Sequence, residues 1–400
     1  MSPQAGLAWN VFGDGKTVVR SGFGIYRDQL PTFLSGVDRF LPPFFSVEEF
    51  VFPQFLSPLN AAVTQPLDPF ATIYHPKFPY ALEYNLNVER ELSAGMILTV
   101  GYFGARGNHL TREAEQNPFE LATGQRYNPN LPSPLLTVLT DAQSFYNSFQ
   151  VSVSKRYAHR FFWQASYTWA HSVDDASVDF SVESVNDPPD SQNIFDRKGS
   201  RGPSDFDIRH NFVANVVYEL PGHGRLLGGW QISAVASVHS GLPFTPVLPF
   251  DNADVQSLLT AERPDLVGNP YAGVCPNGAR VGTPSCWFNP GAFAVPSAGQ
   301  FGNAGRNSLR GPAFAQFDAA LRKDFAITER RKITVGVEAY NLFNHPNFGV
   351  PSNTQSPLSL GGNGDAVFKD AAGHFANNAG QILTTAGTGR QIQLAGRFTF

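Results

Sequence analysis

The connections between predicted strands alternate between very short and very long, and this pattern limits the folds open to the chain. Segments with a period-two alternation of apolar and polar residues are separated by turns of a few residues and then by long links, in strict succession. The long links cover residues 28–79, 105–143, 172–205, 241–313 and 345–388. Loops longer than about 12–15 residues are unusual inside a compact soluble domain. In an up-and-down sheet all five links would leave from the same end, as in outer-membrane barrels.

The alternating segments predict an all-β fold, because the 3.6-residue helical period is nearly absent. From Tyr80 to Val88, for example, large apolar residues alternate with alanine, glutamate and asparagine. We count about eleven such segments, which begin near Trp9, Val19, Tyr80, Met96, Phe149, Phe161, Ile208, Trp230, Phe317, Ile333 and Ile392.

Strand length and aromatic placement favour a membrane barrel over a soluble β-sandwich. The eight steps from Phe161 to Trp169 span roughly 27 Å, or roughly 20 Å of membrane at a tilt of about 40°. Both ends of this segment are aromatic, and such rings favour the membrane interface. The sequence therefore predicts an antiparallel up-and-down transmembrane β-barrel domain over residues 1–400, with short periplasmic turns and long extracellular loops.

Composition excludes several other classes of protein. Charged residues make up 16% of the chain and aromatic residues 13%, with a formal net charge of −4. An ordinary soluble domain carries about 25% charged residues, and no basic stripe is present to bind a nucleic acid. No run of about 18 apolar residues predicts a transmembrane helix. The first residues also lack the cationic and apolar stretches of an export signal, so none is expected in these 400 residues.

Six short segments, spread from one end of the chain to the other, carry a family resemblance. They are Gly15–Tyr26, Tyr167–Ser172, Phe206–His210, Ser240–Thr245, Glu338–Phe348 and Arg397–Phe400. In this order and spacing they resemble the barrel domain of TonB-dependent receptors, in particular the Oar-like branch, over essentially the whole chain. The resemblance implies nutrient uptake across the cell outer membrane with energy relayed from the inner membrane.

The resemblance also implies parts that are not recognised in these residues. A complete receptor of this branch would begin with an export signal and a small β-sandwich, followed by a TonB-contacting segment, a plug and about 22 strands. About eleven strands are predicted here, and single-chain bacterial barrels have even numbers. We therefore expect a C-terminal barrel portion that is completed by a missing N-terminal barrel half and plug, and that reaches TonB only through that part.

Half a barrel in lipid would present two unpaired strand edges, and each unsatisfied backbone group costs several kcal/mol in hydrocarbon. The open form is therefore expected to require completion by further sequence or a second chain. Two alternatives stay open: a self-closed, passive, porin-like channel of about ten to twelve strands, and a soluble or surface-displayed β-rich binding protein.

The last strand carries Phe398 and the terminal Phe400 on one face. Such an ending looks like the signal that the outer-membrane barrel assembly machinery reads. The expected partners are this machinery, outer-membrane lipid and lipopolysaccharide, and a transported ligand that the sequence does not identify. Neither a cofactor nor a nucleic acid is expected.

No set of residues predicts catalysis. Gly13, Gly15, Lys16 and Thr17 match the end of a phosphate-binding loop, but the full pattern requires glycine where Asn10 stands and a helix afterwards. Since a strand follows, a hairpin turn is the better interpretation. The nine histidines are dispersed and no nucleophile-elbow or zinc-protease motif occurs, so we predict no enzyme activity.

Two of the long links contain distinctive residues. In the link at 241–313, Cys275 and Cys286 predict a local disulfide in an oxidising compartment, worth roughly 3 kcal/mol on a chain-entropy estimate. The link at 172–205 is acidic; a solvated loop is the simpler interpretation, and divalent-ion binding the sharper one. Its acidic residues include Asp174, Asp175, Asp179, Glu183, Asp187 and Asp190, which Arg197, Lys198 and Arg201 follow.

Charged residues inside the barrel are weak candidates for ligand contact. More often such residues pair across strands or face a plug. The candidates are Arg20, Glu83, Arg209, Arg322 and Glu338. A phenylalanine-rich stretch at 39–56 either packs under its own loop or recognises a hydrophobic or peptide-like ligand at the outer mouth.

Overall fold

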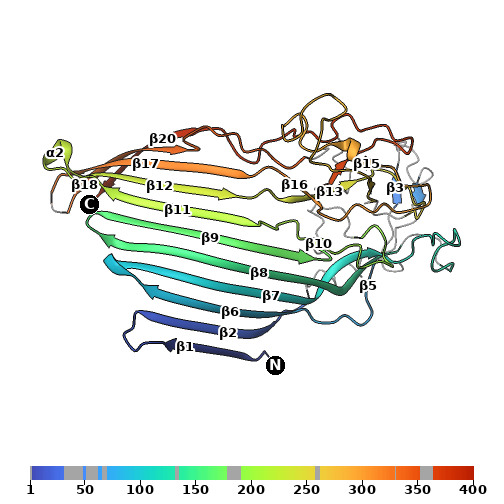
Figure 1. The fold of residues 1–400 in the computed structure, drawn as a ribbon, viewed down its shortest axis with the longest axis horizontal. Helices are drawn as coiled ribbons and strands as arrows, with labels where there is room; N and C mark the ends of the chain where they lie inside the picture. Colours follow the sequence, from blue (N-terminus) through green and yellow to red (C-terminus); the bar gives the residue numbers. More distant parts are fainter. Residues whose placement is uncertain are drawn as a thin grey trace.

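The main body of the molecule is one large β-sheet, seen in a computed structural model (Figure 1). The structure describes residues 2–30, 48–50, 62–64, 70–130, 135–177, 191–256, 262–328, 330–351 and 364–400. Within these residues, no helix combines the length and the apolar character that crossing a membrane requires. The phenylalanine-rich stretch at 39–56 lies outside the described residues except for the backbone of 48–50.

Eleven strands cross the described sheet in chain order, each antiparallel to its neighbours. They are β1 (Gln4–Asn10), β2 (Thr17–Arg27), β6 (Tyr80–Glu91), β7 (Met96–Glu115), β8 (Leu136–Ala158), β9 (Phe161–Asp174), β11 (His210–Glu219), β12 (Trp230–His239), β17 (Phe314–Ala326), β18 (Lys332–Tyr340) and β20 (Gln391–Thr399). Each predicted segment overlaps one of these strands, which confirms the all-β meander and its strand count.

Short and long connections leave from opposite ends of the sheet (Figure 1). The short turns, at residues 11–16, 92–95, 159–160, 220–229 and 327–331, lie at what we call the turn end, together with the short helix α2 (Gly224–Leu227) and the 3-10 turn η3 (Ser93–Gly95). The tightest turn places His159 and Arg160 at φ of 54° and 67°, the left-handed geometry of a two-residue hairpin. The long links leave from the opposite, loop end.

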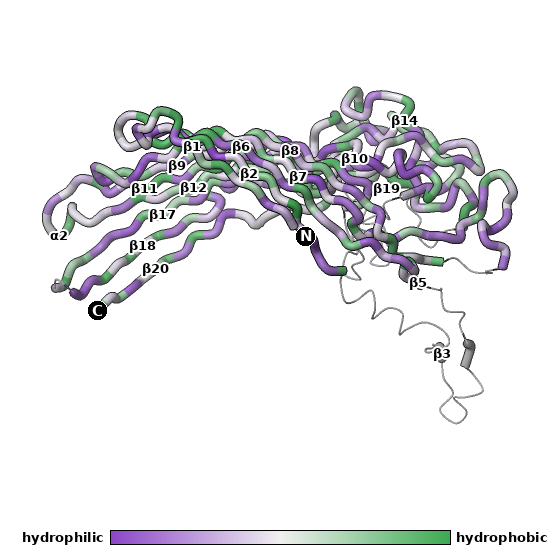
Figure 2. Tube along the Cα trace, turned by 90° about the horizontal axis from the view of Figure 1, so that it is seen from below, coloured by the Kyte–Doolittle hydropathy of each residue, from purple (hydrophilic) through white to green (hydrophobic). Residues whose placement is uncertain are grey.

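The strand register separates the sheet into one apolar and one polar face. Since directly opposed residues share a face, an apolar row crosses six strands through Val88, Val100, Val151, Tyr167, Phe212 and Val238. The next row, on the other face, runs through Asn87, Gly101, Gln150, Thr168, Asn211 and His239. Figure 2 shows the same alternation as changes of hydropathy along each strand, and shows that the sheet is arched.

The sheet is open, with β1 at one edge and β20 at the other. Because the meander has an odd number of strands, these two edge strands run in the same direction, from the loop end to the turn end (Figure 1). Joining them to each other would create a parallel pair in an otherwise antiparallel sheet.

Strands β7 and β8 extend far beyond the rest of the sheet at the loop end, which the sequence did not predict. Residues 105–143 were expected to be a link, but the ladder continues as far as the pair Glu115 and Leu136, with register shifts around Leu110. Apolar alternation is weak in this stretch. The buried Arg112 side chain instead donates two hydrogen bonds to the Asp141 carboxylate, at 2.6 and 3.1 Å.

Described residues of the links at 241–313 and 345–388 form a compact body at the loop end, which we call the loop module. Its centre is a three-stranded sheet of β13 (Pro243–Val247), β16 (Leu309–Arg310) and β19 (Gly364–Ala366), beside the pair β14 (Asp265–Leu266) and β15 (Phe293–Ala294) and the turn η4 (Pro290–Ala292). Its buried core contains Phe244, Leu248, Phe288, Ala292, Phe293, Ala304, Leu309, Val367 and Phe368. The main apolar core of the described residues therefore lies in the links, while the sheet exposes its apolar face.

Four short strands complete the described structure. They are β3 (Glu48–Phe50) paired with β4 (Ala62–Thr64), β5 (Phe70–Thr72) parallel to β8, and β10 (Gly202–Pro203) antiparallel to β9.

Candidate functional site

Charged side chains on the polar face form ion pairs between neighbouring strands. Arg20 lies 2.9 Å from Glu89, and Arg322 lies 2.7 Å from Glu338, which also accepts the Tyr340 hydroxyl hydrogen bond at 3.0 Å. Both pairs are substantially exposed, so each contributes at most about 1 kcal/mol. Glu83 shares this face, and no ion pair to it occurs among the described residues. Four of the five predicted wall residues therefore lie on the polar face.

A hollow opens on the polar face near the turn end. Its lining includes Glu219, Gln231, Arg322, Asp324, Thr334, Glu338 and Arg397. A concave, polar face with charges of both signs is what the inner wall of a barrel presents to a water-filled or plugged lumen.

Arg209 lies elsewhere than predicted, in the bend before β11 rather than in the wall. It donates to Asp207 at 2.9 Å, and Asp207 also accepts from the Ser172 N–H at 2.7 Å and from Arg310. Burial alone would raise the pKa of Asp207, but these donors hold that pKa below its ordinary value. Asp207 thus fastens the link after β9 to the loop module, and Arg209 is one of its anchors.

The acidic link carries a second anchor. Asp174 is 2% exposed and forms an ion pair with Arg306 of the loop module, while Asp175 pairs with Arg197. The other predicted acidic residues, Asp179, Glu183, Asp187 and Asp190, lie outside the described residues. No group of three potential metal-binding side chains occurs in the described part of the chain. Asp174 and Asp175 are therefore both paired with arginine.

Cys275 and Cys286 form a disulfide inside the loop module, with their Cα atoms 5.9 Å apart. Both are buried next to Phe288 of the module core. At the other end of the molecule, the Asn10 side chain accepts hydrogen bonds from the N–H groups of Gly13 and Gly15, at 3.1 and 3.3 Å. These two glycines form an exposed turn between β1 and β2, as the hairpin interpretation predicts.

The apolar face of the sheet carries aromatic residues toward both ends. Trp9, Tyr218 and Phe398 lie near the turn end, and Tyr102, Phe149 and Trp169 lie toward the loop end. All are large apolar side chains that the chain alone leaves exposed, as a lipid-facing surface with interfacial aromatic belts requires. Phe398 and Phe400 stack with ring centroids 5.9 Å apart.

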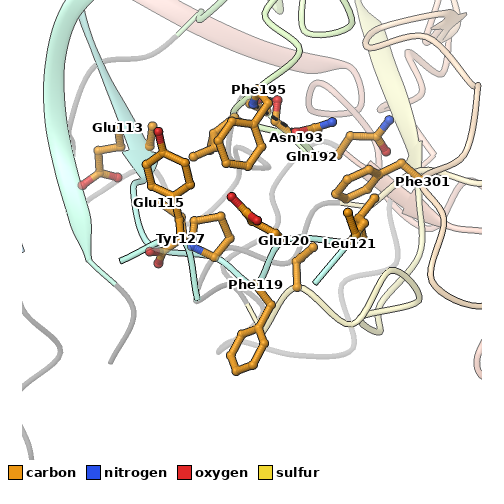
Figure 3. A pocket seen from close by; sticks show the side chains of 16 residues that line it. Glu113, Glu115, Phe119, Glu120, Leu121, Tyr127, Gln192, Asn193, Phe195 and Phe301 are labelled. Atoms are coloured by element: carbon orange, nitrogen blue, oxygen red, sulfur yellow. Dashed lines mark hydrogen bonds between the residues drawn. The ribbon is translucent and has the colours of Figure 1, made fainter. Parts of the chain in front are cut away.

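A second candidate site, which the sequence did not predict, lies outside the wall at the loop end (Figure 3). This external pocket has a volume of about 460 Å³ and is bounded by the end of β7, residues 118–127 and 191–195, and two residues of the loop module. Its apolar lining includes Pro118, Phe119, Leu121, Tyr127, Ile194, Phe195, Val255 and Phe301. The residues come from three separate links, so no local motif could have identified the pocket.

Three glutamates complete the external pocket. Glu113 and Glu115 project from the same side of β7, and Figure 3 shows the Glu120 carboxylate directed toward the middle of the surrounding side chains. Burial raises the pKa of Glu113 to about 7. One oxygen of Glu115 accepts from the N–H groups of Asn117 and Leu135, at 2.8 and 2.7 Å. The other Glu115 oxygen and one oxygen of Glu113 are buried without a hydrogen-bond donor among the described residues.

Comparison with known proteins agrees with the architecture. Residues 1–393 match the family described as the outer membrane beta-barrel domain. The chain belongs to this family. Its described residues form eleven antiparallel strands of such a domain, and its location is the outer membrane. A comparison with curated proteins finds no match.

A solved structure shows the same fold. The outer membrane transporter YddB from Escherichia coli matches all of this chain with a TM-score of 0.50 at 10% identity. The ferric enterobactin receptor PfeA and the ferripyoverdine receptor FpvA, both from Pseudomonas aeruginosa, match with TM-scores of 0.48 and 0.44 at 9% and 10% identity. The chain spans only 40% of YddB, 40% of PfeA and 33% of FpvA.

Proposed function

We propose that this chain is the C-terminal wall of a TonB-dependent transporter of the Oar-like branch, serving nutrient uptake rather than catalysis. One observation carries the proposal: the described residues form an open meander of eleven strands, and the chain covers only 40% of a known outer-membrane transporter. The polar face then lines the lumen, the apolar face meets lipid, and the links at the loop end gather ligand outside the cell.

The direction of the edge strands supports completion by further strands. β1 and β20 run the same way, so direct closure would need a parallel pair, whereas bacterial single-chain barrels have even numbers of antiparallel strands. An odd number of additional strands between β20 and β1 restores antiparallel pairing throughout. It also satisfies the edge N–H and C=O groups, each of which costs several kcal/mol if left unpaired in hydrocarbon.

The remaining roles follow from this arrangement. The plug and the TonB contact belong to the part of the barrel outside these 400 residues, and energised uptake depends on them. Residues 1–400 act as one barrel domain, and Phe398 and Phe400 present the terminal strand to the barrel assembly machinery. The wall pairs around Arg20 and Arg322 stabilise the lumen surface, and Glu83 is the wall carboxylate most open to contact with a plug or ligand.

Thiol cross-linking across the two sheet edges tests the proposal. Cysteines replace Ala8 on β1 and Ala395 on β20, both on the polar face, in the full-length protein in outer membranes. A short bifunctional thiol reagent should give no cross-link between them. As a positive control, the directly opposed pair G336C and A395C should cross-link. A cross-link between residues 8 and 395 would overturn the proposal in favour of a self-closed, passive pore.

A further inference from the structure

The external pocket has the size and walls of a small-molecule site. Its volume of about 460 Å³ falls within the range of about 300–1,000 Å³ typical of ligand pockets. The rings of Tyr127 and Phe195 lie 5.3 Å apart, and both side chains are more than half exposed. Figure 3 places Phe301 across the pocket from Phe195, so aromatic surfaces flank the space on two sides.

The charges in the pocket are all of one sign. Glu113, Glu115 and Glu120 line it, and none of its described lining residues is basic. Two arginines adjoin lining residues in sequence. Arg112 pairs with the Asp141 carboxylate. Arg126 donates to the Asn117 carbonyl at 2.8 Å and lies over the Phe119 ring at 4.7 Å. The Arg126 side chain therefore contacts its own loop, and Arg126 does not line the pocket.

Two carboxylate oxygens in this pocket lack the donors that buried oxygens normally have. Glu115 is only 3% exposed, and its second oxygen has no hydrogen-bond donor among the described residues; the same holds for one oxygen of Glu113. A buried acceptor without a partner destabilises the fold, and more strongly when it is charged. A ligand that brings N–H donors and positive charge would remove that destabilisation.

We propose that the external pocket binds a small primary ammonium ion that carries an aromatic or branched apolar group. The ammonium group supplies three donors, and the Glu120 carboxylate is directed into the space where it can accept them. The rings of Tyr127 and Phe195 offer cation–π and apolar contact. The inference rests on the proposed function, since it names the ligand chemistry of the external loops. Anionic ligands are disfavoured by three carboxylates.

The test measures binding of three matched probes by titration calorimetry at pH 8, where Glu113 is largely ionised. The probes are 2-phenylethylammonium, neutral 2-phenylethanol and anionic 3-phenylpropanoate, and the protein is the full-length form purified from outer membranes. We expect the ammonium probe to bind at least about tenfold more tightly than the alcohol, because a hydrogen bond to a charged group is stronger than one between neutral groups. The anion should bind least.

Variants assign the binding to the pocket. E113Q and E120Q keep the shape of each side chain, so each should weaken the ammonium probe about tenfold while leaving the alcohol unchanged. E91Q, at the turn end of β6, is the matched control and should bind all probes like the unmodified protein. Equal affinity for the three probes, or unchanged ammonium affinity in both pocket variants, would overturn the inference. Neither result depends on how the barrel is closed, which edge cross-linking decides separately.

Discussion

At the scale of single residues, glycine placement on the apolar face makes room for aromatic rings. Gly104 of β7 lies opposite Tyr84 of β6, and a Cβ atom on Gly104 would be 2.2 Å from the Tyr84 ring. The Tyr84 and Tyr102 hydroxyls both donate to the Asn147 side chain, at 3.2 and 2.7 Å. A ring lying over a strand glycine is a known device for fixing register between strands.

Substituting this glycine should displace the ring. We expect G104A to lower stability by about 1–2 kcal/mol in thermal or urea unfolding of the detergent-solubilised protein, since the ring must move and its hydrogen bond is lost. In a Y84A background the same substitution should cost nearly nothing. G396A is the control, because no atom lies within 4 Å of a Cβ placed there. An equal cost in both backgrounds would refute the packing explanation.

The loop module holds a buried carboxyl whose protonation should control its stability. Glu262 is 3% exposed and accepts from the N–H groups of Asn252 and Ala253, at 3.0 and 3.1 Å. Burial and the neighbouring Asp251 carboxylate raise the pKa of Glu262 to about 8. The folded module therefore binds this proton more tightly than the unfolded chain does, whose carboxyl titrates near the ordinary value of about 4.3.

Stability of the loop module should consequently fall as pH rises from about 4.3 to 8 and then level off. Each unit of pKa shift corresponds to about 1.4 kcal/mol, so the change should reach several kcal/mol. Hydrogen-exchange protection factors of the Asn252 and Ala253 amides measure it. E262Q imitates the protonated carboxyl and should flatten the profile. A profile of E262Q that still falls over this range would assign the pH dependence to another group.

At the scale of elements, buried ion pairs hold the long links against one another. Asp174 at the end of β9 and Arg306 of the loop module are 1% and 6% exposed at their side chains, and the same arginine donates to the Ser200 carbonyl at 3.2 Å. Removing one member of such a pair leaves an uncompensated buried charge.

Breaking this pair should undock the link at residues 175–209. We expect R306M to lower the free energy of local unfolding of this link, measured from protease cleavage rates, by about 3–5 kcal/mol. The double variant D174N/R306M should be less affected, because it leaves no buried charge unpaired. R197M, whose side chain is 41% exposed, is the control and should cost at most about 1 kcal/mol. If R306M and R197M cleave at the same rate, the Asp174 pair does not hold the link.

The sequence predicted the elements whose physics is local. Period-two alternation, as from Tyr80 to Val88 or from Phe161 to Trp169, is a property of residues that are neighbours in sequence. It can therefore be recognised without knowing the fold, and it predicted all eleven strands. The extension of β7 and β8 was missed because its ladder is held by Arg112 and Asp141 and has no continuous apolar face.

Features assembled from distant residues could not be predicted. The external pocket brings together Glu113, Phe195 and Phe301, which share no period or motif. The alternating pattern predicts that Arg209 lies in the wall. In the structure β11 begins only at His210, and the Arg209 side chain donates to Asp207 in the preceding bend. Cys275 and Cys286 were within reach of sequence reasoning because only a short loop separates them.

At the scale of the whole molecule, strand parity is the central feature. Eleven antiparallel strands leave two edges that run in the same direction, and each edge carries backbone groups that hydrocarbon cannot satisfy. The 40% coverage of YddB agrees with a wall that further strands complete. Strand parity therefore supports our proposal that these 400 residues work as part of a larger barrel.

The most direct measurement is an immunoblot of isolated outer membranes with an antibody raised against residues 241–313, comparing heated and unheated samples. We expect a heat-modifiable band at more than twice 43.6 kDa, the mass of these 400 residues. A heat-modifiable band near 43.6 kDa would contradict the proposal, because the chain would then insert and close by itself.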